Sequence, residues 1–397
     1  MTMTIVGASV AGVSAIRSLR AHGYTGRICL VDSDPWAPYD KPPLSKGFLL
    51  GTRTRGDMSL ISKTDLDTLA VDLVHGTANG IDTERRAVAL DDGRRLAYER
   101  LVIATGSALR SVPDSWRLDG ILKLRSLDDA VAIKAELVAG ARVMVIGAGF
   151  IGVEVAMSAA ALGARVSLVD MSPGPLWAPL GPMLSPIVAG VIADAGVVEY
   201  FGVSVVALEG QPGRYRAELS DGSRIEADVV VAGLGAEPRI DWLGGSAVDT
   251  DRAVTCNAQC QTTVPDIFAA GDVAAWHNSL YSRRMQVPHW TNAVQQGAYV
   301  GKILQSPAPE AEAPYTHLPY FWTDLGPHRL QVVGVVSPTD SLVWVEKDPA
   351  SESFVALHVD KVSQIVNAVS SMNDAAGLAR WRAKVLRAYE SLTPHTN

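Results

Sequence analysis

The chain has 397 residues, a formal net charge of −7, 48% hydrophobic residues and 19% charged residues. This length accommodates two or three domains with large cores, and the excess of acidic residues argues against non-specific nucleic-acid binding. The longest uncharged stretch, residues 171–193, contains five prolines, which argues against a membrane span.

The cysteines and the first residues bear on the cellular compartment. Cys29, Cys256 and Cys260 provide neither a disulfide framework nor a set of metal ligands, so no metal site is expected. No basic segment precedes the first apolar strand, so we expect no signal peptide. Together these features predict a cytoplasmic protein.

The N-terminal residues predict a dinucleotide-binding turn. We expect a strand at residues 4–6, a helix to about residue 21 and a second strand at residues 28–32, which ends at Asp32. The intervening G-x-G-x-x-G motif has serine in place of its middle glycine, and serine is small enough to allow a phosphate to approach. Asp32 follows 20 residues after the motif, where an acid can bind ribose hydroxyls. The turn consists of Gly7, Ser9, Val10, Ala11 and Gly12.

The segment after Asp32 carries no redox-active cysteine pair. Disulfide reductases with two dinucleotide sites place such a pair here, so the electrons of this chain are expected to leave for an external acceptor. Residues 38–46 read PYDKPPLSK, which resembles the PYDRPPLSK signature of the FAD-dependent reductases that serve two-iron ferredoxins and rubredoxins. These include components of bacterial ring-hydroxylating dioxygenase and cytochrome P-450 systems, and the resemblance covers nearly the whole chain. Lys41 replaces the usual arginine, which keeps the charge but loses a two-pronged contact with phosphate.

A second glycine turn in the middle of the chain has the complete G-x-G-x-x-G motif, Gly147, Gly149, Phe150, Ile151 and Gly152. It follows a predicted strand at residues 143–146, opens a helix and is followed by a second strand that ends at Asp170. An acid at this position favours NADH over NADPH, because it accepts from the ribose 2′-OH and repels a 2′-phosphate. Two such turns predict two cofactors that exchange electrons; the alternative is a duplicated scaffold with one inactive site.

Three further stretches match the same reductase family. Residues 104–110 resemble its ATG-x-x-x-R pattern, residues 262–273 (TTVPDIFAAGDV) its second flavin signature, and residues 319–334 its C-terminal PYFWSD signature. The second flavin signature implies that the N-terminal turn binds FAD and the central turn binds NADH. Arg110 would then face the FAD pyrophosphate, with an ordinary surface arginine as the alternative.

The resemblance implies specific cofactor contacts. Beyond the first glycine turn, those with FAD are Asp32, Lys41, Lys46, Ala78, Thr105, Gly106, Arg110, Gly271, Asp272, Val273 and Trp290. Beyond the second turn, those with NADH are Glu154, Asp170 and Gly235.

The implied fold is α/β, with two Rossmann-type dinucleotide-binding domains of the glutathione-reductase type and a small C-terminal α+β domain. The FAD-binding domain would comprise residues 1–108 and 239–312. The NAD-binding domain, residues 109–238, would be inserted in it, and the C-terminal domain would comprise residues 313–397 and cap the flavin.

The resemblance implies an NADH-dependent flavoprotein reductase. NADH would pass hydride to flavin N5, and the flavin would release electrons singly to a two-iron two-sulfur ferredoxin or a rubredoxin that serves an oxygenase. Lys46, Glu154 and Trp290 are the predicted catalytic residues, with Lys46 and Glu154 meeting near N5. The alternatives are an acid at position 154 stabilised by the helix dipole and a solvated surface lysine at position 46.

The acceptor is expected to dock near Arg283, Arg284, Trp290 and Trp322. Two other functions stay open: an NADH oxidase or nitrite-reductase-type flavin module, and a flavoprotein with a binding or signalling role, as in the related apoptosis-inducing flavoproteins. The absence of a cysteine near residue 43 argues against the first. The sequence leaves open a monomer or a homodimer.

Overall fold

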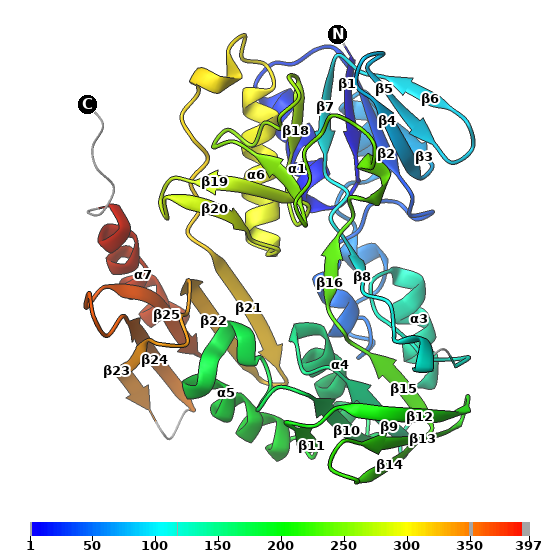
Figure 1. Cartoon of the computed structure of the whole chain (residues 1–397), viewed down its shortest axis with the longest axis vertical. Coiled ribbons are helices and arrows are strands. Elements are labelled where there is room, and N and C mark those ends of the chain that lie inside the picture. Colours follow the sequence, from blue (N-terminus) through cyan, green and yellow to red (C-terminus); the bar gives the residue numbers. More distant parts are fainter. Residues whose placement is uncertain (1, 117, 349–351, 391–397) are drawn as a thin grey trace.

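A computed structural model describes residues 2–116, 118–348 and 352–390 of the chain. Figure 1 shows a sheet built mainly from the N-terminal part, a second sheet from the middle of the sequence and a third from the C-terminal part. None of the helices in these described ranges combines the length and hydropathy needed to cross a membrane.

The first sheet is parallel and draws on two separate parts of the sequence. Its strands, in spatial order, are β18 (Ile267–Ala269), β7 (Arg100–Ile103), β1 (Thr2–Val6), β2 (Arg27–Asp32) and β3 (Val71–His75). Helix α1 (Val10–Ala21) connects β1 to β2. Most residues of β1 and β2 are buried, which explains why both strands read as apolar runs rather than as an alternating pattern.

Helix α1 packs backbone against backbone on α6 (Trp290–Ile303). A side-chain carbon added at Gly297 would lie 2.2 Å from the carbonyl oxygen of Ala11, and one at Gly301 would lie 2.3 Å from that of Ala15. Only glycine permits this approach. The helix that follows the second flavin signature is therefore held directly against the helix of the first glycine turn.

Two small sheets, one antiparallel and one mixed, and several short helices complete this region. The sheets are formed by β4 (Ala78–Asp82), β5 (Ala87–Leu90) and β6 (Arg95–Ala97), and by β17 (Val254–Cys256), β19 (Ala274–Asn278) and β20 (Arg283–Gln286), in which β17 and β19 are parallel. The helices are η1 (Pro42–Ser45), η2 (Gly56–Met58), α2 (Lys63–Thr68), η4 (Asp241–Leu243) and η5 (Pro309–Ala311).

The second sheet is also parallel. Its strands, in spatial order, are β11 (Val198–Phe201), β10 (Arg165–Asp170), β9 (Arg142–Ile146) and β15 (Val229–Ala232). Helix α4 (Phe150–Ala161) connects β9 to β10. Around it lie η3 (Asp114–Trp116), α3 (Leu127–Glu136), α5 (Trp177–Asp194) and an antiparallel sheet of β12 (Val205–Gln211), β13 (Arg214–Leu219) and β14 (Arg224–Ala227).

The chain crosses between the two parallel sheets twice, through a short two-stranded ribbon. This ribbon pairs β8 (Ser107–Leu109) with β16 (Ala236–Pro238) in antiparallel register, and Figure 1 shows it between the two bodies. These crossings lie close to the domain boundaries predicted at residues 108 and 238, and they support that division, which stays a proposal.

The C-terminal part forms an antiparallel sheet covered by one helix. Its strands, in spatial order, are β21 (Tyr320–Leu325), β22 (His328–Gly334), β25 (Val366–Met372), β24 (Ser353–Val359) and β23 (Ser341–Asp348). Helix α7 (Ala375–Glu390) packs against β25 and β22. The predicted fold class, two Rossmann-type domains and a small α+β domain, is confirmed.

One hydrophobic cluster joins all three regions. It contains Leu44 from the segment before the first crossing, Val155 from α4, and Phe321 and Leu325 from β21. Burial of apolar surface does not by itself orient side chains. Because the three segments pack in one cluster, however, their relative positions are fixed, and so is the place where their polar side chains meet. It therefore sets the geometry of the site described next.

Candidate functional site

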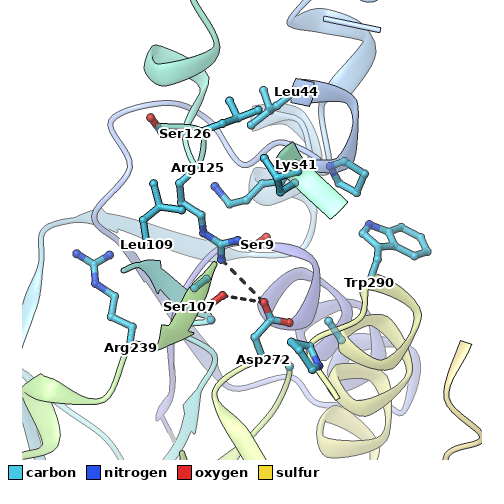
Figure 2. A pocket seen from close by; sticks show the side chains of 18 of the residues that line it. Ser9, Lys41, Leu44, Ser107, Leu109, Arg125, Ser126, Arg239, Asp272 and Trp290 are labelled. Atoms are coloured by element: carbon cyan, nitrogen blue, oxygen red, sulfur yellow. Dashed lines mark hydrogen bonds and ion pairs between the residues drawn. The ribbon is translucent and has the colours of Figure 1, made fainter. Parts of the chain in front are cut away.

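A cavity of about 1370 Å³ is lined by residues from all three regions. Its walls include Gly7 of the first glycine turn, Gly149 of the second and Phe321 of β21. This volume exceeds the roughly 300–1,000 Å³ of a common small-molecule pocket, so it accommodates a large ligand or more than one. Figure 2 shows a close view of part of its lining.

Most of the residues singled out in the sequence come together around this cavity. Those that line it are Gly7, Ser9, Val10, Ala11, Asp32, Lys41, Lys46, Thr105, Gly106, Arg110, Gly149, Phe150, Ile151, Gly152, Glu154, Gly235, Gly271, Asp272 and Trp290. Ala78 lines a neighbouring pocket of about 50 Å³. Gly12, Gly147, Asp170 and Val273 do not line the cavity. The contacts that the sequence-predicted residues make with each cofactor stay proposals.

The glycines of the two turns serve two different purposes. A side-chain carbon at Gly12 would lie 2.0 Å from the carbonyl oxygen of Gly7, and one at Gly152 would lie 1.8 Å from that of Gly147, so both let a helix pack onto its turn. A side-chain carbon at Gly149 would meet open space, so this position leaves room for a ligand. Ser9 has a φ of −85°, which any residue adopts, so serine replaces glycine there without strain.

Helices α1 and α4 present open N-termini at the two turns. Neither helix has an acidic residue in its first turn or a hydrogen bond from its N-cap side chain, Ser9 making none. The first N–H groups of each helix are therefore not satisfied by side-chain caps, and they carry the positive end of the helix dipole. Each turn fits a phosphate of a dinucleotide.

The two acids that end the second strands have different surroundings. Asp32 lines the cavity, and burial raises the pKa of its carboxyl above the usual value. The carboxylate of Asp170 accepts the backbone N–H of Ala148 (2.6 Å) and that of Ser172 (2.7 Å), which ties the second glycine turn to the end of β10. Each carboxylate oxygen can accept more than one bond, so Asp170 keeps acceptor capacity for a ribose hydroxyl.

Lys46 and Glu154 form an ion pair, with 2.8 Å between Nζ and Oε1. Glu154 is 4% exposed and is the fifth residue of α4, not a first-turn residue, so the helix dipole alone does not account for it. The Lys46 side chain is 19% exposed, so it is not a solvated surface group. The structure thus joins a residue of the N-terminal region to one that follows the second glycine turn.

The rings of Trp290 and Trp322 lie edge to face at the cavity wall, with 5.9 Å between their centroids. Trp290 is 37% exposed and is the first residue of α6. His289 precedes it and lines the cavity, and burial lowers the pKa of its imidazole to about 4. The imidazole is therefore neutral at physiological pH.

Sequence reasoning missed Arg125 and Ser107. Figure 2 shows both directed toward Asp272: the hydroxyl of Ser107 donates to its carboxylate (3.0 Å), and the guanidinium of Arg125 lies 4.0 Å from the same oxygen. Arg110, the arginine chosen from the sequence, also lines the cavity but is exposed. The sequence feature that could have identified Arg125 is its position directly before Ser126, which begins the capping box of α3.

Cations gather near this part of the cavity. Burial lowers the pKa of the Lys41 ammonium, and the nearby charge of Arg125 lowers it further. Lys41 lies 4.0 Å from Asp34 and over the ring of Tyr39. Two cations that disfavour each other in this way favour an anionic ligand between or beside them.

Arg283 and Arg284 lie on β20, outside the cavity lining. Both are exposed, and among the described residues neither has an ion-pair partner. The same strand ends at Gln286, which does line the cavity. A free positive surface thus adjoins the site.

The comparisons with known proteins agree with this architecture. Residues 1–297 match the family described as pyridine nucleotide-disulphide oxidoreductase. The chain belongs to this family. Residues 320–396 match a second family, described as reductase C-terminal.

The chain is similar to several reductases over most of its length. It is 33% identical to putidaredoxin reductase of Pseudomonas putida over 349 residues, 86% of this chain and 82% of that protein. It is 32% identical to the ferredoxin–NAD(+) reductase component of the p-cumate 2,3-dioxygenase system of the same organism, over 96% of this chain and 92% of that protein. A crystal structure of a ferredoxin reductase from Rhodopseudomonas palustris matches with a TM-score of 0.90 at 30% identity, over 96% of this chain and 93% of the other.

Membership in the pyridine nucleotide-disulphide oxidoreductase family implies FAD and NADH as the cofactors. The site fits both. Two glycine turns with open helix N-termini face one cavity, and cationic side chains line its wall near Asp272.

Proposed function

We propose that the chain is an FAD-dependent NADH:ferredoxin reductase, which passes electrons from NADH to an iron–sulfur ferredoxin or a rubredoxin that serves an oxygenase. The observation that carries this proposal is the single cavity between two glycine turns. Two dinucleotides bound at the two turns can bring their ring systems together in it, where Lys46 and Glu154 form their ion pair.

The chain's own residues position the cofactors. The open N-termini of α1 and α4 would hold the two pyrophosphates, and Arg125 and Lys41 would neutralise the pyrophosphate of FAD. Lys46 presents its ammonium to the cavity, while Glu154 keeps that ammonium in place. When bound, the flavin accepts two electrons as hydride and releases them singly, which is chemistry that the protein orients rather than performs.

The absence of thiols from the site supports an external acceptor. All three cysteines of the chain are buried, and none of them lines the cavity. An internal disulfide therefore cannot take the electrons from this site. The relatives named as putidaredoxin reductase and as a dioxygenase ferredoxin reductase support a ferredoxin as the acceptor. We further propose a cytoplasmic location.

The docking surface for this acceptor comprises Arg283, Arg284, Trp290 and Trp322. Its support is that both arginines are exposed without ion-pair partners in the described part of the chain, and that the two tryptophans lie at the cavity wall. Two-iron ferredoxins are usually acidic, and this chain has a net charge of −7. A local positive surface is therefore needed to bring the two proteins together.

The experiment is an anaerobic electron-transfer assay on the purified holoprotein. We expect a yellow protein from which acid releases FAD, a flavin that NADH reduces, and transfer to a two-iron ferredoxin much faster than to oxygen. Release of FMN, or no reduction by NADH, contradicts the cofactor assignment. Oxygen consumption that outpaces transfer to every ferredoxin tried favours the oxidase alternative, and a long-lived reduced flavin with slow transfer to all acceptors favours the signalling alternative.

A further inference from the structure

The carboxylate of Glu154 is bound by three donors from two distant segments of the chain. Its Oε1 atom accepts from Lys46 Nζ at 2.8 Å and from Thr323 Oγ1 at 2.9 Å. Its Oε2 atom accepts from Ser45 Oγ at 2.5 Å. Ser45, Glu154 and Thr323 are 1%, 4% and 0% exposed. A carboxylate buried this deeply needs such donors to replace its hydration, and together they hold it in one orientation.

Thr323 is the contribution of the C-terminal sheet to this cluster. It lies on β21, whose residues alternate between buried and half-buried from Tyr320 to Leu325, so its side chain shares the buried face with Phe321. A threonine hydroxyl has one proton to donate, and here that proton goes to Glu154. The next residue back, Trp322, lines the cavity.

Ser45 is fixed in a similar way from the other side. Its hydroxyl donates to Glu154, and its backbone carbonyl accepts from the hydroxyl of Ser158, one turn further along α4. The 3₁₀ helix η1 is thus attached to α4 at two points, directly before Lys46. The position of the Lys46 ammonium therefore depends on Glu154, and the orientation of Glu154 depends on the two hydroxyls.

We propose that Thr323 is a positioning residue for hydride transfer from NADH, which acts by fixing Glu154 and through it the ammonium of Lys46; this inference rests on the proposed function. Ser45 has the same role on the other carboxylate oxygen. Without the Thr323 hydroxyl, Oε1 is bound by Lys46 alone. The carboxylate is then held by two donors, Ser45 and Lys46, instead of three, so its orientation and the position of the ammonium are less tightly fixed.

The test compares Thr323→Val, which keeps the shape and removes the hydroxyl, with Thr323→Ser, which keeps the hydroxyl. The measurement is flavin reduction by NADH in anaerobic stopped flow with the holoprotein, resolved into a limiting rate and an apparent Kd for NADH. Loss of one hydrogen bond to a charged group predicts a limiting rate about tenfold lower in the valine variant. We expect the serine variant to keep the normal rate, and both variants to keep their FAD content and their Kd for NADH.

Thr291→Val is the matched control. The hydroxyl of Thr291 donates to the backbone carbonyl of Tyr320 on the same strand (2.7 Å) and does not contact Glu154, so this variant should keep the normal rate. A valine variant at position 323 with the normal rate overturns the inference, as does a serine variant as slow as the valine one. If Thr323→Val fails to fold, Ser45→Ala decides, with the same tenfold loss expected and a normal rate overturning the inference. Wild-type flavin that NADH does not reduce contradicts the proposed function instead.

Discussion

The indole N–H of Trp290 donates a hydrogen bond to the carboxylate of Asp40, with 2.7 Å between Nε1 and Oδ1. This bond connects the first residue of α6 to the PYDKPPLSK segment, so the aromatic wall of the cavity and the segment that bears Lys46 are held together. Burial raises the pKa of Asp40, and the bond from Trp290 opposes that rise. The bond from Trp290 therefore favours the charged form of Asp40.

Trp290→Phe tests this connection. Phenylalanine keeps an aromatic ring against Trp322 but cannot donate to Asp40, which is left partly buried without its partner. We expect the free energy of unfolding of the holoprotein to fall by about 1 kcal/mol, the usual contribution of one hydrogen bond, as measured by urea denaturation. Trp322→Phe is the control, because Trp322 makes no bond to Asp40. An equal loss of stability in both variants shows that ring packing, not the hydrogen bond, is responsible.

Arg125→Ala should weaken FAD binding more than Arg110→Ala. Arg125 is partly buried and lies 4.0 Å from Asp272, whereas Arg110 is exposed. Loss of a charge-assisted contact in a partly buried site predicts an increase of about tenfold in the Kd for FAD, and the Arg110 variant should change it little. The measurement is titration of the apoprotein with FAD, followed by quenching of flavin fluorescence. The opposite order of effects assigns the pyrophosphate contact to Arg110.

The chain should prefer NADH to NADPH. Asp170 ends β10 with spare acceptor capacity, and Met171, which follows it, is 75% exposed and carries no charge for a 2′-phosphate. Loss of a charged hydrogen bond predicts a preference of roughly tenfold to a hundredfold in kcat/KM. Asp170→Asn should reduce this preference by removing the repulsion, although asparagine keeps only one of the two backbone bonds because it has a single acceptor oxygen. Equal kcat/KM for the two nucleotides in the wild type shows the assignment wrong.

Charge reversal on β20 tests the docking surface. In Arg283→Glu with Arg284→Glu, we expect a higher KM for ferredoxin and a flatter dependence of the rate on salt, because rim charges act mainly on the encounter rate. Reduction of ferricyanide, which needs no docking surface, should be unchanged. Arg214→Glu with Arg224→Glu makes the same change of charge on β13 and β14, away from the cavity, and should leave the KM normal. Normal ferredoxin reduction by the β20 variant at low salt places the docking surface elsewhere.

Acid should destabilise the fold by protonating two buried histidines. Burial lowers the pKa of His317 and of His358 from 6.5 to about 4. The unfolded state therefore binds more protons between these values, so the stability contributed by the neutral imidazoles is complete above pH 6.5 and is lost as the pH falls toward 4. Between pH 7 and pH 5 each of the two histidines lowers the free energy of unfolding by about 2 kcal/mol at most.

His358→Gln should reduce that loss. Glutamine does not titrate, and its amide can retain the contact that His358 makes with the hydroxyl of Ser370 (2.7 Å). The free energy of unfolding of the holoprotein is measured by urea denaturation at pH 7 and pH 5. Its fall between these pH values should be about 2 kcal/mol smaller in the variant than in the wild type. His277→Gln, at an exposed position, is the control. The same pH difference in wild type and His358→Gln contradicts the assignment.

The sequence predicts the fold class and the two turns because both depend on local rules. Gly7 and Gly147 have φ values of +111° and +104°, and side-chain carbons there would clash with neighbouring carbonyl oxygens. Only glycine fits these two positions, so the motif can be recognised in the sequence. Strands buried on both faces produce apolar runs that are equally readable.

The contacts around Glu154 and Asp272 could not be predicted in the same way. Ser45 and Thr323 lie 109 and 169 residues from Glu154 in the sequence, and Ser107 lies 165 residues from Asp272. Ser45 and Thr323 each lie in a stretch that resembles the reductase family, but neither stretch reveals that the two hydroxyls reach the same carboxylate. Only the packing of three regions around one hydrophobic cluster brings them there.

The pairing of β8 with β16 places the start and the end of the middle region side by side, with Ser107 opposite Pro238. A segment whose two ends adjoin can be replaced without changing the path of the chain on either side. The nucleotide specificity of this reductase could therefore be exchanged as a block, by grafting the corresponding segment of a relative between β8 and β16, provided that the graft keeps Arg125 and Glu154, which belong to the flavin site.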